Sequence, residues 1–142
     1  MRTQARFQTD LFKPLTDDSD QLENGRQLAD WLCANLPADM QPDSMDEDWG
    51  YRVIFGASEL NAKVSVCCGH VEGNQWSCSC EPYRSLTDKL LQRPPPLLEL
   101  DKVVRTIDSL LAGSSSIYDV EWFENDAKLR EFNHGSRAFS DQ

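Results

Sequence analysis

The sequence has 142 residues, of which 39% are hydrophobic, a length and composition typical of one globular domain with its own core. No apolar run reaches the roughly 20 residues of a membrane-spanning helix, and residues 1–10 lack the apolar segment of a secretory signal. The formal net charge is −10, and the five cysteines cannot all pair with one another. These features predict a cytoplasmic protein with reduced thiols that binds neither nucleic acid nor a membrane.

Most of the net negative charge lies in one region of the chain. Residues 14–48 contain ten acids and one base, whereas the rest of the chain contains fourteen acids and thirteen bases. A field of this sign attracts cations or a basic protein surface and repels nucleic acid. An acidic face that only maintains solubility is the alternative interpretation.

The first part of the chain combines a strand pattern and a helix pattern. Residues 3–7 alternate in side-chain character, which predicts a short, half-exposed first strand. Apolar and small residues recur at intervals of three and four over residues 22–36, which predicts a helix that begins near Asp20 and is ended by Pro37. Residues 37–48 are acidic and are expected to form a connection.

Three strands are predicted next, in close succession. Residues 51–55, 64–68 and 76–80 each alternate between two kinds of side chain, as strands with one buried face do. Gly73 and Asn74 separate the second and third of these segments, and both residue types accept the positive φ values of a tight turn. The sequence therefore predicts a β-hairpin at this point.

The last part of the chain predicts helices and one further strand. Residues 85–88 have the form of a helix start, and residues 99–112 carry apolar side chains along one helical face. A final strand is predicted with Tyr118, Val120 and Trp122 on one side.

The predicted order is β-α-β-β-β-α-β, which belongs to the α+β class. We expect a mostly antiparallel sheet of about five strands with two main helices packed on one face. A single domain is expected over residues 1–123, followed by a polar, mobile tail over residues 124–142.

Five potential metal ligands fall within fourteen positions of the predicted hairpin, namely Cys67, Cys68, His70, Cys78 and Cys80. A structural zinc site needs four ligands that converge as a tetrahedron, usually from Cys-x2-4-Cys pairs. A two-residue turn would place Cys67, Cys78 and Cys80 on one face of the hairpin. Cys68 and His70 would then point to the other face. We therefore expect small buried thiols and no cofactor, rather than a zinc site.

No catalytic motif in the sequence has the context that its chemistry requires. His70-Val71-Glu72 resembles the His-x-Glu of zinc deaminases, but the Pro-Cys-x-x-Cys half of that signature is absent. Cys33 lies in the predicted first helix, where packing is its expected role. We therefore expect a non-enzymatic protein. A small metal-binding or thiol-dependent enzyme that uses the Cys-rich hairpin is the alternative.

Three short motifs resemble those of a family of small, mostly uncharacterised bacterial proteins. They are Phe7-Gln8-Thr9-x-x-Phe12, Asn24-Gly25-x-x-Leu28-Ala29-x-Trp31-Leu32 and Glu47-Asp48-Trp49-Gly50-Tyr51. The family motifs are F-x-S/T-x-x-F, N-x-G-x-x-L-A-x-W-L and E-D-W-G-W, so this chain departs at Asn24, which directly precedes Gly25, and at Tyr51. The resemblance covers residues 2–80. It implies one bacterial cytoplasmic domain and transfers no catalytic residue.

The leading functional hypothesis is a protein-binding domain, specifically an immunity protein that neutralises a bacterial toxin. Its motive is the acidic region beside aromatic residues, which suits a partner with a basic surface. A scaffold or regulatory protein is a further alternative. The expected partner-binding residues are Asp17, Asp18, Asp20, Asp43, Asp46, Glu47, Asp48, Trp49 and Tyr51.

Overall fold

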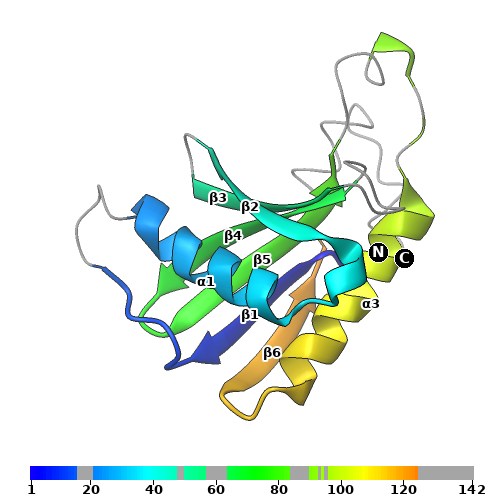
Figure 1. Cartoon of the computed structure of the whole chain (residues 1–142). Coiled ribbons are helices and arrows are strands. Elements are labelled where there is room, and N and C mark those ends of the chain that lie inside the picture. The colour runs from blue at the N-terminus through cyan, green and yellow to red at the C-terminus, as the bar shows by residue number, and fades with distance from the viewer. Residues whose placement is uncertain are drawn as a thin grey trace.

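The computed structural model of the chain describes residues 1–15, 21–47, 50–56, 64–83, 90–92, 94 and 96–124. Within these residues the elements are β1 (Gln4–Thr9), α1 (Gln21–Asn35), the 3-10 turn η2 (Ala38–Met40), β2 (Pro42–Glu47), β3 (Gly50–Phe55), β4 (Val64–Glu72), β5 (Gln75–Pro82), α3 (Leu97–Gly113) and β6 (Ile117–Phe123) (Figure 1). The helix start predicted at residues 85–88 lies outside the described residues, as does the predicted tail beyond residue 124.

The six strands form one sheet in the order β2-β3-β4-β5-β1-β6, and every neighbouring pair is antiparallel. The α+β class is therefore confirmed, whereas the expected number of about five strands is too low by one. The N-terminal strand β1 lies inside the sheet, between β5 and β6, so its backbone is paired on both sides.

The additional strand is β2, in the segment for which the sequence predicts an acidic connection. Its six residues pair with all six residues of β3, from Pro42 opposite Phe55 to Glu47 opposite Gly50. Aspartate and proline are generally depleted in strands. At a sheet edge, however, the outer side of the backbone needs no hydrogen-bond partner, and polar side chains can remain in contact with water. Both residue types are therefore tolerated there. The predicted connection was wrong for this reason.

Two features limit hydrogen bonding along the outer edge of β2. The bond from the N–H of Gly56 to the carbonyl of Gln41, at 3.0 Å, shows that the even-numbered residues of β2 direct their backbone groups away from β3. Pro42 has no N–H, and the N–H of Ser44 donates to Oδ1 of Asp43 at 2.9 Å. These features hinder the addition of another strand at this edge.

Both helices pack on the same face of the sheet, which we call the helix-covered face. Helix α1 contacts β2, β3 and β4, and helix α3 contacts β4, β5 and β6 (Figure 1). One cluster of buried apolar side chains fills the space between the layers, with Phe7, Val53, Val66 and Trp76 from the sheet. Neither helix in the described part of the chain is long and apolar enough to cross a lipid bilayer.

Residues of the first two sequence motifs hold α1 and the segment before it against the sheet. The buried side chain of Asn24 accepts a hydrogen bond from the N–H of Leu15 at 2.8 Å and donates one to its carbonyl at 3.2 Å. The ring of Phe12 packs edge-on against Trp76, with centroids 5.1 Å apart, and against Trp31, at 6.4 Å. These motif residues therefore stabilise the packing of the hydrophobic core.

A β-bulge changes the predicted orientation of side chains in β6. The register between β1 and β6 shifts between Arg6 and Gln8, and Asp119 has a positive φ of 54°. Val120 and Trp122 pack against the core as expected. Tyr118, which was expected beside them, is instead 42% exposed because the extra residue reverses the alternation.

Candidate functional site

The partner-binding residues predicted from the sequence fall on two neighbouring strands or outside the described residues. Asp43, Asp46 and Glu47 lie in β2, and Tyr51 lies in β3. The residues outside the described ranges are Asp17, Asp18, Asp20, Asp48 and Trp49.

The strand structure of β2 divides its acidic residues between the two faces of the sheet. Asp46 is paired with Tyr51 on the helix-covered face, where Tyr51 packs against the core. Asp43 and Glu47 point to the opposite face, and Oε1 of Glu47 lies 3.3 Å from Nε of Arg52. The predicted residues therefore surround the edge of the sheet instead of sharing one side of it.

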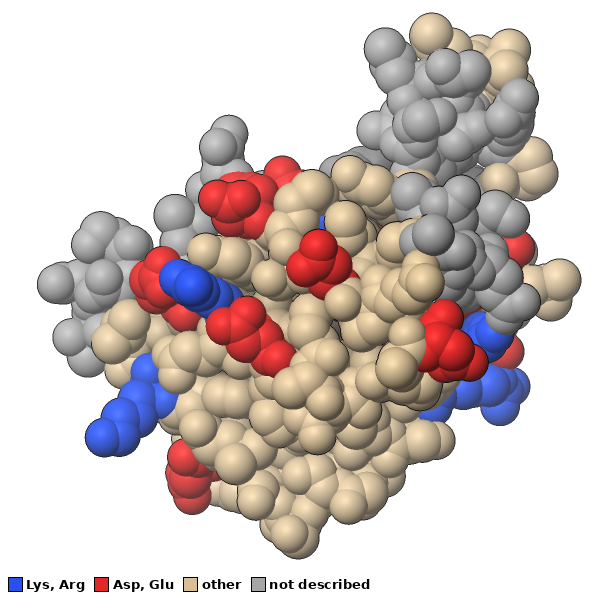
Figure 2. Space-filling view, viewed as in Figure 1, with Lys and Arg blue, Asp and Glu red and all other residues tan. Residues whose placement is uncertain are grey.

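The acids of α1 and η2 continue the charge of β2 around this edge of the sheet, and we call the acids on both sides of the edge the acidic surface. Its members are Glu23, Asp30, Asp39, Asp43, Asp46 and Glu47. Figure 2 shows acidic side chains spread over the face that carries α1, where they outnumber the basic ones. Arg26 lies between two members, at 3.6 Å from Glu23 and 3.7 Å from Asp30.

The electrostatic environment of Cys33 links the helix to the edge strand. Burial raises the pKa of this thiol to about 11, with further contributions from the negative charges of Asp43 and then Asp30. One charge belongs to β2 and the other to α1, so both elements place acids around the same half-buried thiol. At neutral pH the thiol is protonated, and its half-buried side chain packs against the apolar core.

The Cys-rich hairpin has the predicted turn but a different register. Glu72 pairs with Gln75, as a two-residue turn at Gly73 and Asn74 requires. A bulge between His70 and Glu72 then shifts every later pair by one residue.

This shift overturns the predicted division of the cysteines. Cys68 is directly opposite Cys78 and shares the helix-covered face with it and with Cys80, whereas Cys67 is opposite Ser79 and points to the other face. The prediction had grouped Cys67 with Cys78 and Cys80, and it was wrong because one extra residue in a strand reverses the alternation.

The thiols on the helix-covered face are buried and protonated. Burial raises the pKa of Cys78 to about 12. Burial also raises the pKa of Cys68 and of Cys80 well above the usual range, and neighbouring thiols add to both effects. A thiolate is the reactive form of cysteine as a nucleophile and as a metal ligand, so these three positions disfavour both kinds of chemistry.

The side chains of the hairpin do not converge as metal ligands. The ring of His70 packs against Trp76, with centroids 4.7 Å apart, and its Nε2 bonds to the carbonyl of Gly73 at 2.8 Å. Because a carbonyl only accepts, Nε2 carries the proton. Among the described residues, no three His, Cys, Asp or Glu side chains are grouped so that they could hold a metal ion.

A mostly buried polar cluster lies on the opposite face of the sheet, and the sequence analysis missed it. Nη1 of Arg52 donates to Oγ of Ser65 at 2.7 Å and lies 3.7 Å from Oε1 of Glu81. The thiol of Cys67 donates to the same carboxylate oxygen at 2.9 Å, and the guanidinium lies over the ring of Tyr83 at 5.1 Å. We call these residues the Arg52 cluster.

The Arg52 cluster connects three consecutive strands. The side chain of Arg52 in β3 is 14% exposed and that of Glu81 in β5 is 8% exposed, with Ser65 and Cys67 of β4 between them. A charge pair this well buried needs accompanying hydrogen bonds, and the cluster supplies them to Nη1 of Arg52 and to Oε1 of Glu81. The alternation of side chains along the three strands could have predicted this cluster. Arg52, Cys67 and Glu81 all alternate with apolar residues and so lie on the other face of the sheet from them.

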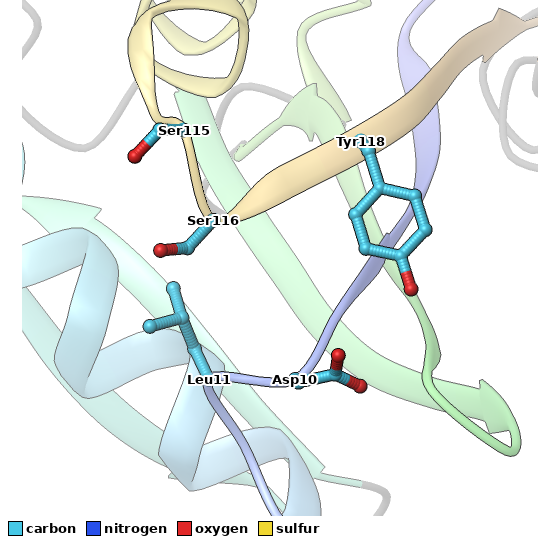
Figure 3. Close-up of a pocket in the computed structure, with 5 residues that line it drawn as sticks. All are labelled: Asp10, Leu11, Ser115, Ser116 and Tyr118. Atoms are coloured by element: carbon cyan, nitrogen blue, oxygen red, sulfur yellow. The ribbon is translucent and has the colours of Figure 1, made fainter.

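A separate pocket of about 320 Å³ lies where β1 ends and β6 begins (Figure 3). It is lined by Asp10, Leu11, Ser115, Ser116 and Tyr118. Figure 3 shows the carboxylate of Asp10 and the hydroxyl of Tyr118 on one side, with Leu11 and the two serines on the other. The sequence analysis did not identify this pocket, because its lining comes from segments more than 100 residues apart.

Comparison with models of known protein families, with curated proteins and with solved structures finds no match for this chain.

Proposed function

We propose that this chain is a non-enzymatic domain that binds a basic partner protein through the acidic surface. The observation that carries the proposal is the state of Asp39, Asp43 and Asp46. All three are exposed, and none forms an ion pair with any described residue. Their field is therefore directed into solvent, where it accelerates encounter with a positively charged surface.

The class of partner that fits this surface best is a toxin with a basic surface, such as a nuclease. The chain would then act as an immunity protein in the cytoplasm of a bacterium. The family resemblance of residues 2–80 supports a bacterial origin, and the negative field disfavours nucleic acid as a direct partner.

The thiol-dependent and metal-binding alternatives receive less support from the geometry. The three buried cysteines of the hairpin are protonated at neutral pH. Cys67 is the thiol on the opposite face, and its sulfur donates to Glu81 within the Arg52 cluster.

Crosslinking in bacterial cells that produce the tagged chain, followed by mass spectrometry, identifies the partner. The association rate of the purified pair is then measured at low and high salt for the wild type and for Asp43→Lys/Asp46→Lys. We expect the double variant to associate roughly tenfold or more slowly at low salt, with a smaller difference at high salt.

The matched control is Glu72→Lys, which reverses an exposed charge at the far end of β4. This variant should associate at nearly the rate of the wild type. An unchanged rate in Asp43→Lys/Asp46→Lys, or an equal loss in both variants, would contradict the proposal.

A further inference from the structure

The pocket between the end of β1 and the start of β6 has walls that are held in place by hydrogen bonds. The amide nitrogen of Asn74 donates to the hydroxyl of Tyr118 at 2.7 Å and lies 3.4 Å from Oδ1 of Asp10. These bonds orient the carboxylate and the phenol from the turn between β4 and β5. The groups that face the pocket are therefore positioned before any ligand arrives.

A second set of bonds fixes the opposite wall. Oγ1 of Thr9, a buried residue, donates to the carbonyl of Ser116 at 2.7 Å and accepts from the N–H of Leu11 at 3.1 Å. This one hydroxyl ties the segment after β1 to the turn before β6. The hydrogen bonds of the Thr9 hydroxyl therefore fix the position of Leu11 relative to the two serines.

The chemistry of the lining favours a cation with an apolar stem. The carboxylate of Asp10 provides a negative charge, and the hydroxyls of Ser115, Ser116 and Tyr118 provide acceptors. The side chain of Leu11, 45% exposed, supplies an apolar wall, and none of the described lining residues is basic. An alkyl ammonium or guanidinium group satisfies these three properties together.

The exposure of the pocket indicates how such a cation would be delivered. Tyr118 is 42% exposed, so both it and Leu11 form an open rim rather than an enclosed cavity. Pockets for free small molecules usually bury most of the ligand surface. A side chain carried by a protein needs less enclosure, because contacts elsewhere offset the cost of association.

We propose that this pocket receives a lysine or arginine side chain from a partner protein, with Asp10 as the charged contact. The inference goes beyond the acidic surface. Asp10 precedes the acidic region of residues 14–48 and lies on the segment after β1, whereas the acidic surface belongs to α1, η2 and β2.

The test uses N-acetyl-lysine methylamide as the probe and N-acetyl-norleucine methylamide as its uncharged match. Each is titrated into the ¹⁵N-labelled full chain to millimolar concentration while amide resonances are followed. We expect the lysine probe to shift the amides of Leu11, Ser115 and Ser116, and the norleucine probe to leave them nearly unchanged. Asp10→Asn should weaken binding of the lysine probe about fivefold, as expected for a partly exposed charge pair.

The control variant is Asp39→Asn, which removes an exposed charge from η2 and should bind the probe like the wild type. Cadaverine serves as a free diamine and distinguishes a site for soluble amines from one for protein side chains. The proposal is overturned by equal shifts with norleucine, by unchanged affinity in Asp10→Asn, by no saturable shift with lysine, or by tighter binding of cadaverine. None of these readouts involves the acidic surface, so failure here leaves the proposed function standing.

Discussion

A Cβ atom placed on Gly25 of α1 would lie 2.8 Å from the carbonyl oxygen of Cys68 in β4. This separation is shorter than side-chain carbons tolerate, and the obstructing atom belongs to a backbone that is paired within the sheet. Glycine at this position therefore lets the helix approach β4 more closely than any other residue would allow.

Gly25→Ala should destabilise the fold by about 2 kcal/mol, because the overpacking outweighs the gain of about 1 kcal/mol in helix propensity. Urea denaturation measures the change. Gly113→Ala is the matched control at the end of α3, where a Cβ atom meets nothing within 4 Å. That variant should be neutral or slightly more stable, and a similar loss in both variants would show that the contact with Cys68 has no special role.

Asn24→Ala should cost about 2 kcal/mol, because it removes both hydrogen bonds between the fully buried Asn24 side chain and the backbone of Leu15. Gln27 provides a matched comparison. Its side-chain amide forms the same pair of hydrogen bonds with the backbone of Lys13, at 3.0 Å and 2.8 Å, but in an exposed setting. Gln27→Ala should therefore cost much less. Chemical denaturation of the two variants checks the difference, and equal losses would refute the importance of burial here.

Glu81→Ala should destabilise the protein by about 2 kcal/mol, because Arg52 loses a nearly buried charged partner, although Glu47 stays 3.3 Å from its Nε. The double variant Arg52→Met/Glu81→Leu should recover most of that loss, since it removes both charges and keeps apolar volume. Asp101→Ala is the control, because its bond to Arg105 at 2.8 Å lies on an exposed helix surface and its loss should have little effect. If the double variant is no more stable than Glu81→Ala, the charge pair is not the source of the loss.

The raised pKa of Cys78 predicts a specific alkaline loss of stability. The thiol has a pKa of about 12 in the folded protein against 9.0 without the fold, so between these values the unfolded chain binds fewer protons than the folded one. The free energy of unfolding therefore falls as pH rises above 9, by up to about 1.4 kcal/mol for each pH unit.

Lysine and tyrosine also titrate in this range, so the comparison requires Cys78→Ser, which keeps the size of the side chain and removes the titration. Denaturation of both proteins from pH 8 to pH 11 should give a steeper decline for the wild type. Parallel curves would mean that Cys78 does not contribute to the pH dependence.

The sequence allowed most of the fold to be predicted wherever apolar alternation was strong. The strands around Val53, Val66 and Trp76 and both main helices were found with the correct inward faces, because burial against helices demands that pattern. The edge strand β2 escaped prediction because an edge requires neither apolar alternation nor the absence of proline.

The candidate sites were harder to predict, because they depend on register. The bulge between His70 and Glu72 places Cys68 opposite Cys78, and the residue types in this segment do not predict a bulge. The Arg52 cluster depends on the alignment of three strands, and the pocket at Asp10 on the meeting of two distant segments. Alternation within one strand carries no information about either alignment.

The blunted edge of β2 also limits how copies of this chain can assemble. A sheet with two receptive edges can add copies at both ends and grow into a fibre. Here Pro42 lacks an N–H and Asp43 occupies the N–H of Ser44, so growth at this end is opposed. Growth of a continuous sheet through successive copies of this chain is therefore hindered at the β2 edge, which disfavours an open-ended fibre.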